Sequence, residues 1–188
     1  MTETELLEGR DLPAYRSEPL PMAPIRGDFF ITEPVLRSTR DALVETALEG
    51  IHECGHEEMV LWAGKEWEET TFFLSTILPR TTHSRHGVDI EEQAVGLVSQ
   101  AARKHGVSVL AQVHSHPGSE TIHSDGDDDL ILMPFEGMLS VVAPRFGVEM
   151  NGLGSLSIHQ YQNGRWVLCT PKSIEESFTV VSEEIDAR

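Results

Sequence analysis

The order in which helix-like and strand-like apolar patterns follow one another constrains the fold of this chain more than any other feature. A helical pattern extends from Thr32, the expected N-cap, to Gly50, and a second begins at Asp89 and ends at Gly106. Short apolar or β-branched runs predict strands at residues 59–63, 71–78, 107–113, 139–143, 156–162 and 165–169. Because strands follow one another directly at both ends, a regular doubly wound fold does not fit. The order predicts a three-layer or sandwich-like α/β domain around one mixed sheet.

Three further local signals refine this prediction. Asn163-Gly164 separates two strand-like runs by two residues and predicts a tight hairpin turn. Residues 80–88 are polar, carry His83 and His86, and are expected to form a loop. The run at 107–113 has few polar residues, which favours a central position in the sheet.

The domain organisation follows from length and composition. A chain of 188 residues suits one domain with short tails. Residues 1–28 are acidic, aperiodic and rich in proline, so they are expected to form an N-terminal extension that is partly disordered or laid on the domain as a strap. The domain itself is expected at residues 29–172. Residues 173–188 are charged and are expected to form a short helix or a tail.

The charge balance excludes several classes of partner. The chain has 14 basic and 31 acidic residues, a formal net charge of -17, which disfavours binding to nucleic-acid backbones or anionic membranes. No apolar run is long enough to span a bilayer, and the N-terminus lacks the pattern of a secretory signal. Cys54 and Cys169 are far apart and form no CxxC unit, as is typical of thiols in a reducing compartment. The expected location is therefore cytoplasmic.

One segment carries residues suited to metal chemistry. His114-Ser115-His116-Pro117 follows the central apolar run directly, and Ser124 and Asp127 come shortly after. Two histidines two residues apart on an extended chain point the same way, so both imidazoles can coordinate one metal ion such as zinc. Asp127 can supply a third ligand if the chain folds back. Three protein ligands leave a fourth position open for water, which is the catalytic arrangement.

Each part of this segment also has a simpler explanation. A His-x-His pair is often only an exposed loop, and Ser124-x-x-Asp127 can be a helix cap. Asp127 and the acidic residues after it can be a solvated helix N-terminus. The combination favours the metal site, and a cap would help to hold Asp127 rigidly. His123, next to Ser124, is expected to be an exposed loop residue with at most a minor role in touching substrate.

The string from His114 to Asp127 resembles the signature of the JAMM, or MPN-plus, zinc metalloproteases. This resemblance implies an α/β sandwich with a curved mixed sheet between helices. It also implies zinc-dependent cleavage of isopeptide or peptide bonds at the C-terminus of ubiquitin or a ubiquitin-like protein. The family motif has an upstream glutamate a few residues before a glycine that ends a strand. The spacing to Gly64 favours Glu57, and Glu58 is the alternative; Val60 departs from the pattern, because a glycine is common at that place.

The resemblance also assigns roles to individual residues. His114, His116 and Asp127 would hold Zn²⁺. Glu57 would act as the general base that takes a proton from the metal-bound water and passes it to the leaving amine. The Ser124 hydroxyl would donate a hydrogen bond to the oxyanion that forms during hydrolysis.

Two other functions are weighed against hydrolysis. A catalytically silent scaffold domain of the same fold typically lacks a ligand, and here none is missing. Some bacterial proteins with a similar His-x-His-Pro segment are linked to DNA repair, but the net charge of -17 argues against contact with DNA. The sequence does not name the ubiquitin-like substrate or the oligomeric state.

Overall fold

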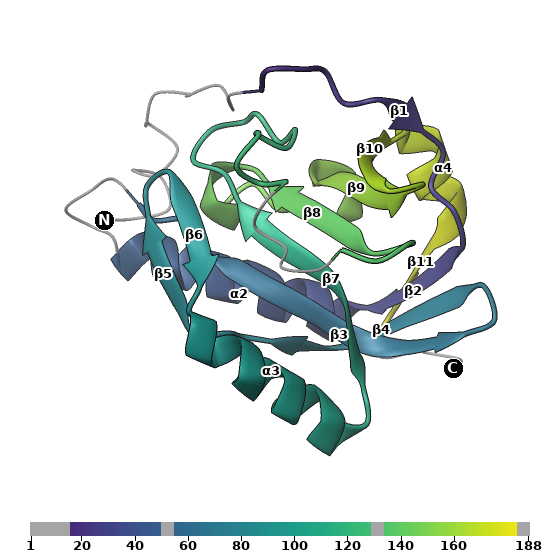
Figure 1. The fold of residues 1–188 in the computed structure, drawn as a ribbon, viewed down its shortest axis with the longest axis horizontal. Helices are drawn as coiled ribbons and strands as arrows, with labels where there is room; N and C mark the ends of the chain where they lie inside the picture. The colour runs from purple at the N-terminus through teal and green to yellow at the C-terminus, as the bar shows by residue number, and fades with distance from the viewer. Residues whose placement is uncertain (1–15, 50–54, 129–133, 184–188) are drawn as a thin grey trace, which may run out of the picture.

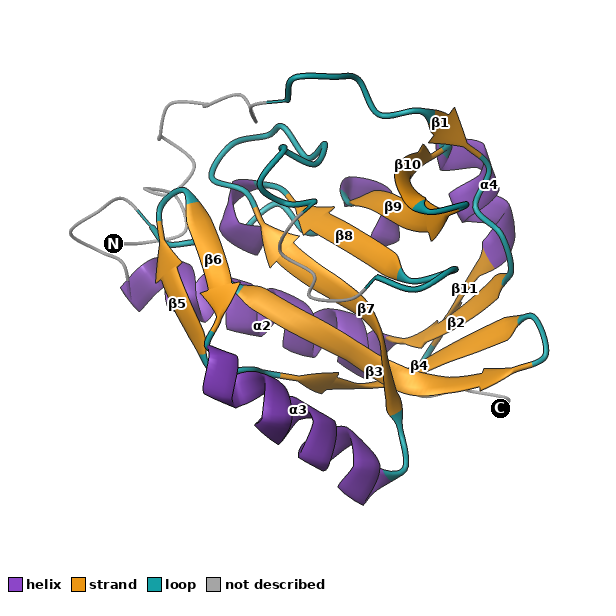
Figure 2. Ribbon diagram, viewed as in Figure 1, coloured by secondary structure: helices purple, strands orange, loops and turns teal. Residues whose placement is uncertain are grey.

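A computed structural model of the protein describes residues 16–49, 55–128 and 134–183. Figures 1 and 2 show a curved mixed sheet with helices packed against it, which confirms the predicted fold class. Within the described residues, nine strands form the main sheet in the order β1-β10-β9-β8-β7-β3-β4-β2-β11, and β5 and β6 form a separate hairpin. Residues 1–15, Cys54 and the acidic residue after Asp128, all considered above, lie outside the described part.

The strands and helices have the following bounds. The strands are β1 (Met22–Ala23), β2 (Asp28–Thr32), β3 (Met59–Trp67), β4 (Thr70–Ile77), β5 (Thr81–Ser84), β6 (Gly87–Ile90), β7 (Ser108–Ser115), β8 (Leu139–Ala143), β9 (Ser157–Gln162), β10 (Arg165–Cys169) and β11 (Phe178–Val181). The α-helices are α2 (Glu33–Glu49), α3 (Glu92–His105) and α4 (Pro171–Ser177), and two 3₁₀ turns, η2 (Arg145–Gly147) and η3 (Leu153–Ser155), follow β8.

The sheet is buried on both faces at its centre. Val60 and Trp62 of β3 pack with Leu43 of α2 in the main core, whereas the alternate residues Met59 and Leu61 pack in a second cluster together with the partly buried Val98 of α3. Since successive side chains of a strand point to opposite faces, α2 and α3 cover opposite sides of β3 (Figure 2). β7, the next strand, lies between β3 and β8, so the prediction of a central strand at 107–113 is confirmed.

The predicted loop at residues 80–88 is wrong. Residues 81–84 and 87–90 form the antiparallel β5–β6 hairpin, and α3 begins only at Glu92 instead of after a cap at Asp89. The tertiary structure explains the difference, because Val88 is buried against Met59 and Leu61 of β3. A single buried apolar residue among polar neighbours gives too weak a pattern to predict a strand.

β3 does not end at Gly64, where the sequence pattern stops. The strand continues to Trp67, and its pairing with β4 shifts register between Ala63 and Gly64. A Cβ atom at position 64 would overlap the backbone carbonyl of Phe72. Gly64 therefore permits a close approach of two backbones within a continuous strand.

The outermost strands of the sheet come from the two ends of the described chain. β1 pairs in parallel with β10, and β11 pairs in parallel with β2, where the rings of Phe29 and Phe178 stack 4.8 Å apart. The turn between β9 and β10 is the predicted two-residue hairpin, since Asn163 and Gly164 both adopt positive φ angles. Among the helices of the described residues, none is both long and apolar enough to cross a membrane.

Candidate metal centre

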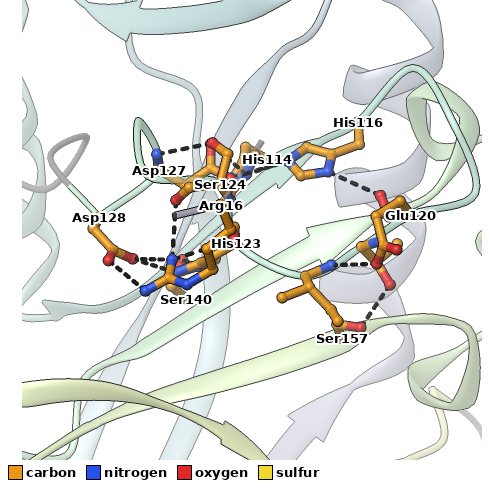
Figure 3. Close-up of polar contacts among 12 residues, drawn as sticks. Arg16, His114, His116, Glu120, His123, Ser124, Asp127, Asp128, Ser140 and Ser157 are labelled. Carbon is orange, nitrogen blue, oxygen red and sulfur yellow. Dashed lines mark hydrogen bonds and ion pairs between the residues drawn. The ribbon is translucent and has the colours of Figure 1, made fainter. Parts of the chain in front are cut away.

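The central strand of the sheet places both histidines of the motif. β7 pairs antiparallel with β3 and parallel with β8, so His114 near its end is completely buried. The amide of His116 donates to the carbonyl of Ala143 at 2.9 Å, which extends the pairing with β8 beyond the strand. The two imidazoles therefore point the same way, and their Nε2 atoms lie 3.2 Å apart (Figure 3).

A tight turn brings Asp127 to the same point. The amide of Ser124 donates to Asp127 Oδ2 at 2.6 Å, and the amide of Asp127 donates to Ser124 Oγ at 3.2 Å. This reciprocal pair has the geometry of a cap, yet the carboxylate still reaches both histidines, with Oδ2 3.1 Å from His116 Nε2 and Oδ1 3.3 Å from His114 Nε2. The cap and the ligand interpretations of Ser124-x-x-Asp127 are thus compatible.

The three side chains make a candidate metal site. His114, His116 and Asp127 are all buried, and each offers one donor atom within 4.8 Å of the others. Among the described residues this is the only group of three or more such side chains that comes so close. Two imidazole nitrogens and one carboxylate oxygen suit a borderline divalent metal and leave a fourth coordination position open.

A hydrogen bond to the backbone fixes which atom of His116 can bind a metal. His116 Nδ1 lies 2.9 Å from the backbone carbonyl of Glu120. A carbonyl only accepts, so Nδ1 carries the proton and the lone pair of Nε2 faces the cluster. His114 Nδ1 is buried and has no hydrogen-bond partner within the described structure.

The pKa values of His114, His116 and Asp127 depend on one another through their charges and hydrogen bonds. Burial lowers the pKa of His114. Burial also disfavours charge on His116, but its hydrogen bond and charge interaction with Asp127 outweigh this effect and raise its pKa. Asp127 is the reverse case, because its interactions with both histidines outweigh burial and hold its pKa well below the usual range. The carboxylate is therefore ionised at neutral pH, as a metal ligand must be.

Glu57 lies beside this cluster. Glu57 lies two residues before the start of β3, and its amide donates a hydrogen bond to the carbonyl of Ser84 in β5 at 2.8 Å. Its side chain is buried, and burial raises its pKa to about 8, with His116 opposing the rise and Asp127 adding to it. The carboxyl group of Glu57 is thus close enough to His116 and Asp127 for their charges to affect its pKa.

Glu58, the alternative general base, is held elsewhere. Its carboxylate accepts hydrogen bonds from Thr46 Oγ1 at 2.8 Å, Thr81 Oγ1 at 2.9 Å and the amide of Met59 at 2.7 Å. These bonds connect α2, β3 and β5. Its backbone amide also donates to Ser115 Oγ at 3.2 Å, so Ser115 serves the packing of β3 on β7. The contacts of the two glutamates therefore favour Glu57 as the residue that serves the metal site.

The prediction that His123 is exposed is wrong. His123 is fully buried, with Nε2 2.7 Å from Ser140 Oγ and Nδ1 3.2 Å from Asp128 Oδ1. Its ring stacks on that of His159 at 3.9 Å, and the ring of His114 lies 6.0 Å away. The sequence hint was slight: Ser140 is a lone polar residue in the apolar run of β8, which indicates a buried polar partner but not which one.

The structure defines an α/β domain with a buried His-His-Asp group that could hold a metal, and comparisons with known proteins identify its family. Residues 37–151 match the family described as prokaryotic homologs of the JAB domain. A protein of Sinorhizobium fredii (strain NBRC 101917 / NGR234) described as "Probable metalloprotease y4jG" is 32% identical over 110 residues, which cover 56% of this chain and 67% of the relative. This chain therefore belongs to the family of prokaryotic JAB-domain homologues.

One solved structure matches at the level of the fold. The solution structure of DSY2949 from Desulfitobacterium hafniense superposes with a TM-score of 0.60 at 13% identity, covering 82% of this chain and 94% of that one. The crystal structure of AF2198, a JAB1/MPN domain protein from Archaeoglobus fulgidus, gives a TM-score of 0.46 at 16% identity, covering 82% of this chain and 98% of that one.

Proposed function

We propose that this protein is a zinc-dependent peptidase or isopeptidase of the JAMM type. The observation that carries the proposal is the buried cluster of His114, His116 and Asp127 with Glu57 beside it. The S. fredii relative, described as a probable metalloprotease, supports the same reaction class. When bound, zinc lowers the pKa of its coordinated water to ~7, so that hydroxide is available at neutral pH.

Glu57 is the general base in this proposal. Burial raises its pKa to about 8 in the metal-free protein, and a bound cation would favour the ionised form that accepts a proton. A carboxyl group in a buried position also keeps this proton away from bulk water until the leaving amine accepts it. Glu58 lacks that freedom, because three donors already bind its carboxylate.

Ser124 is the proposed oxyanion donor. Its Oγ accepts the amide of Asp127, which leaves the hydroxyl proton free to be donated to a substrate oxygen. The same turn fixes Asp127, so donor and metal ligand keep a constant separation. A preorganised donor of this kind stabilises the charge that develops in the transition state.

The proposed substrate is the C-terminus of ubiquitin or a ubiquitin-like protein. The resemblance of the His114–Asp127 string to the JAMM signature supports this choice. The net charge of -17 suits a partner with a basic surface, although charge governs association rate and selectivity more than affinity.

Metal content tests the foundation of the proposal. The purified protein is expected to hold about one zinc per chain, whereas His116→Ala is expected to lose it. His86 is an exposed histidine in the β5–β6 turn, and His86→Ala is the matched control that should keep the metal. A parent protein that takes up no zinc from excess metal at neutral pH would contradict the proposal and leave a catalytically silent scaffold as the better function.

Cleavage of ubiquitin-like fusion proteins tests the reaction. Glu57→Gln should retain zinc and lose activity by ~10²- to 10⁴-fold, the usual contribution of a general base. Glu66→Gln, at the exposed end of β3, is the control and should cleave like the parent. Activity near that of the parent in Glu57→Gln would remove this residue from the mechanism, and Glu58→Gln would then be the next variant.

A further inference from the structure

The described N-terminal segment lies against the turn that carries Asp127. Figure 1 shows it crossing above the loops that follow β7 before it joins β10 as β1. Arg16, the first described residue, is more than one hundred positions away from this turn in sequence. Its side chain is only 17% exposed.

Arg16 binds three separate groups of the turn. Its Nη1 donates to the carbonyls of His123 and Ser124, both at 3.2 Å, and its Nη2 pairs with Asp128 Oδ2 at 2.9 Å (Figure 3). The amide of Ser17 adds a bond to Asp125 Oδ2 at 3.1 Å. A planar guanidinium that spans both sides of a turn fixes its backbone more tightly than a single ion pair does.

The inner side of the same turn is fixed by His123. The Asp128 carboxylate pairs with Arg16 on the solvent side of the turn and with His123 Nδ1 on its buried side. His123 Nε2 in turn forms a hydrogen bond with Ser140 Oγ in β8. Gln112 of β7 donates to the same hydroxyl at 3.0 Å. A continuous polar chain therefore runs from the N-terminal segment, through the turn, to the central strands of the sheet.

We propose that Arg16 is a positioning residue of the metal site. It holds the turn between His123 and Asp128 in the conformation that points the Asp127 carboxylate at His114 and His116. Asp127 lies between the bonded carbonyl of Ser124 and the bonded carboxylate of Asp128, so both of its flanks are held by one side chain. This inference rests on the proposed function only in requiring a bound metal. It adds that the segment before β1 is part of the metal-binding unit.

The test measures zinc affinity and the geometry of the site, without measuring activity. Arg16→Ala is compared with Arg26→Ala, which removes an arginine between β1 and β2 whose exposed ion pair is made with Glu136 and not with the turn. Zinc dissociation constants come from chelator competition, and the absorption spectrum of the cobalt(II)-substituted protein reports ligand geometry. Circular dichroism confirms that each variant is folded at the temperature used.

Arg16→Ala is expected to weaken zinc binding by ~10- to 100-fold and to change the cobalt spectrum, as is usual when a group that orients a ligand is lost. Arg26→Ala should match the parent in both. Arg16→Lys keeps a positive charge near Asp128 but cannot bridge the carbonyls of His123 and Ser124. Its affinity for zinc should therefore lie between that of Arg16→Ala and that of the parent.

Some results would overturn the proposal. An Arg16→Ala protein with a dissociation constant within about twofold of the parent and an unchanged cobalt spectrum would do so, as would an equal loss in Arg26→Ala. A parent that binds no metal would overturn both this inference and the proposed function. A parent that binds zinc, loses affinity on Arg16→Ala and cleaves no ubiquitin-like fusion would contradict only the proposed function.

Discussion

The buried carboxyl group of Glu57 makes the stability of the metal-free protein depend on pH in a defined way. Burial raises the pKa of this group from its ordinary value of 4.5 to about 8. Between these pH values the folded protein keeps a proton that the unfolded chain releases. The free energy of unfolding therefore falls as pH rises through this window, because the unfolded state binds fewer protons.

The size of the effect follows from the shift. Each pH unit within the window costs up to about 1.4 kcal/mol, so from pH 5 to pH 7 the contribution of Glu57 falls by about 2–3 kcal/mol. Glu57→Gln removes the ionisation and keeps the shape. The variant is expected to match the parent closely near pH 5 and to exceed it in stability progressively up to pH 8.

Urea denaturation in the presence of a chelator at pH 5, 6, 7 and 8 measures this difference. Glu66→Gln, at the exposed end of β3, is the control and should follow the parent at every pH. With zinc bound, the positive charge favours the ionised form of Glu57, so the difference should shrink. A difference between Glu57→Gln and the parent that stays constant across this range would refute the assignment of a buried, protonated Glu57.

Three other perturbations have expected outcomes. Gly64→Ala should lower the free energy of unfolding, measured in urea, by about 2–4 kcal/mol, because the new Cβ would overlap the carbonyl of Phe72. A Cβ at position 154 meets no other atom, so the control Gly154→Ala should change this free energy by less than about 0.5 kcal/mol. Equal effects of the two substitutions would contradict the close approach of the backbones at Gly64. Trp62→Phe should cost about 1–3 kcal/mol, since it removes the 2.8 Å bond from the indole to Thr39 Oγ1 and leaves a small void; an unchanged urea midpoint would argue against that bond. Zinc at 100 times its dissociation constant should stabilise the fold by about 2.7 kcal/mol and raise Tm by about 5–10 °C over chelated protein, and a Tm insensitive to zinc would speak against the metal site.

The relation between the metal centre and the N-terminal segment has a practical consequence. A truncated protein that begins at the predicted domain start, Phe29, would lack both Arg16 and β1. If Arg16 positions the turn, such a protein would bind zinc more weakly for a reason unrelated to its ligands. Measurements of metal content and activity are therefore best made on the full chain.

Much of the candidate metal site could be predicted from sequence, because its residues lie close together along the chain and their relative positions depend on local backbone geometry. Two histidines two residues apart at the end of an apolar strand share a side, whatever surrounds the strand. Ser124 and Asp127, three residues apart, form reciprocal hydrogen bonds, which is the local geometry that the cap interpretation of this pair describes. The same locality explains why the Asn163-Gly164 hairpin was predicted correctly: both residues take the positive φ angles that such a turn needs.

Elements that depend on distant partners were not predictable in this way. The β5–β6 hairpin gains its burial from Val88 against β3, and His123 gains its burial from Ser140 and His159 on other strands. Neither residue lies in a hydrophobic periodicity that would indicate its burial from the sequence. A histidine between polar neighbours gives the same local pattern whether it faces water or the core.

By itself, then, the sequence determined the α/β class, the central strand and the trio of His114, His116 and Asp127, because strand periodicity and short turns act over a few residues. Only the tertiary structure distinguished Glu57 from Glu58, since it binds the Glu58 carboxylate to Thr46 and Thr81 and buries that of Glu57, whose pKa responds to the charges of His116 and Asp127. It alone brought the N-terminal segment to the turn of Asp127. Such contacts join residues more than one hundred positions apart, where only the packing of the whole sheet fixes which side chains meet.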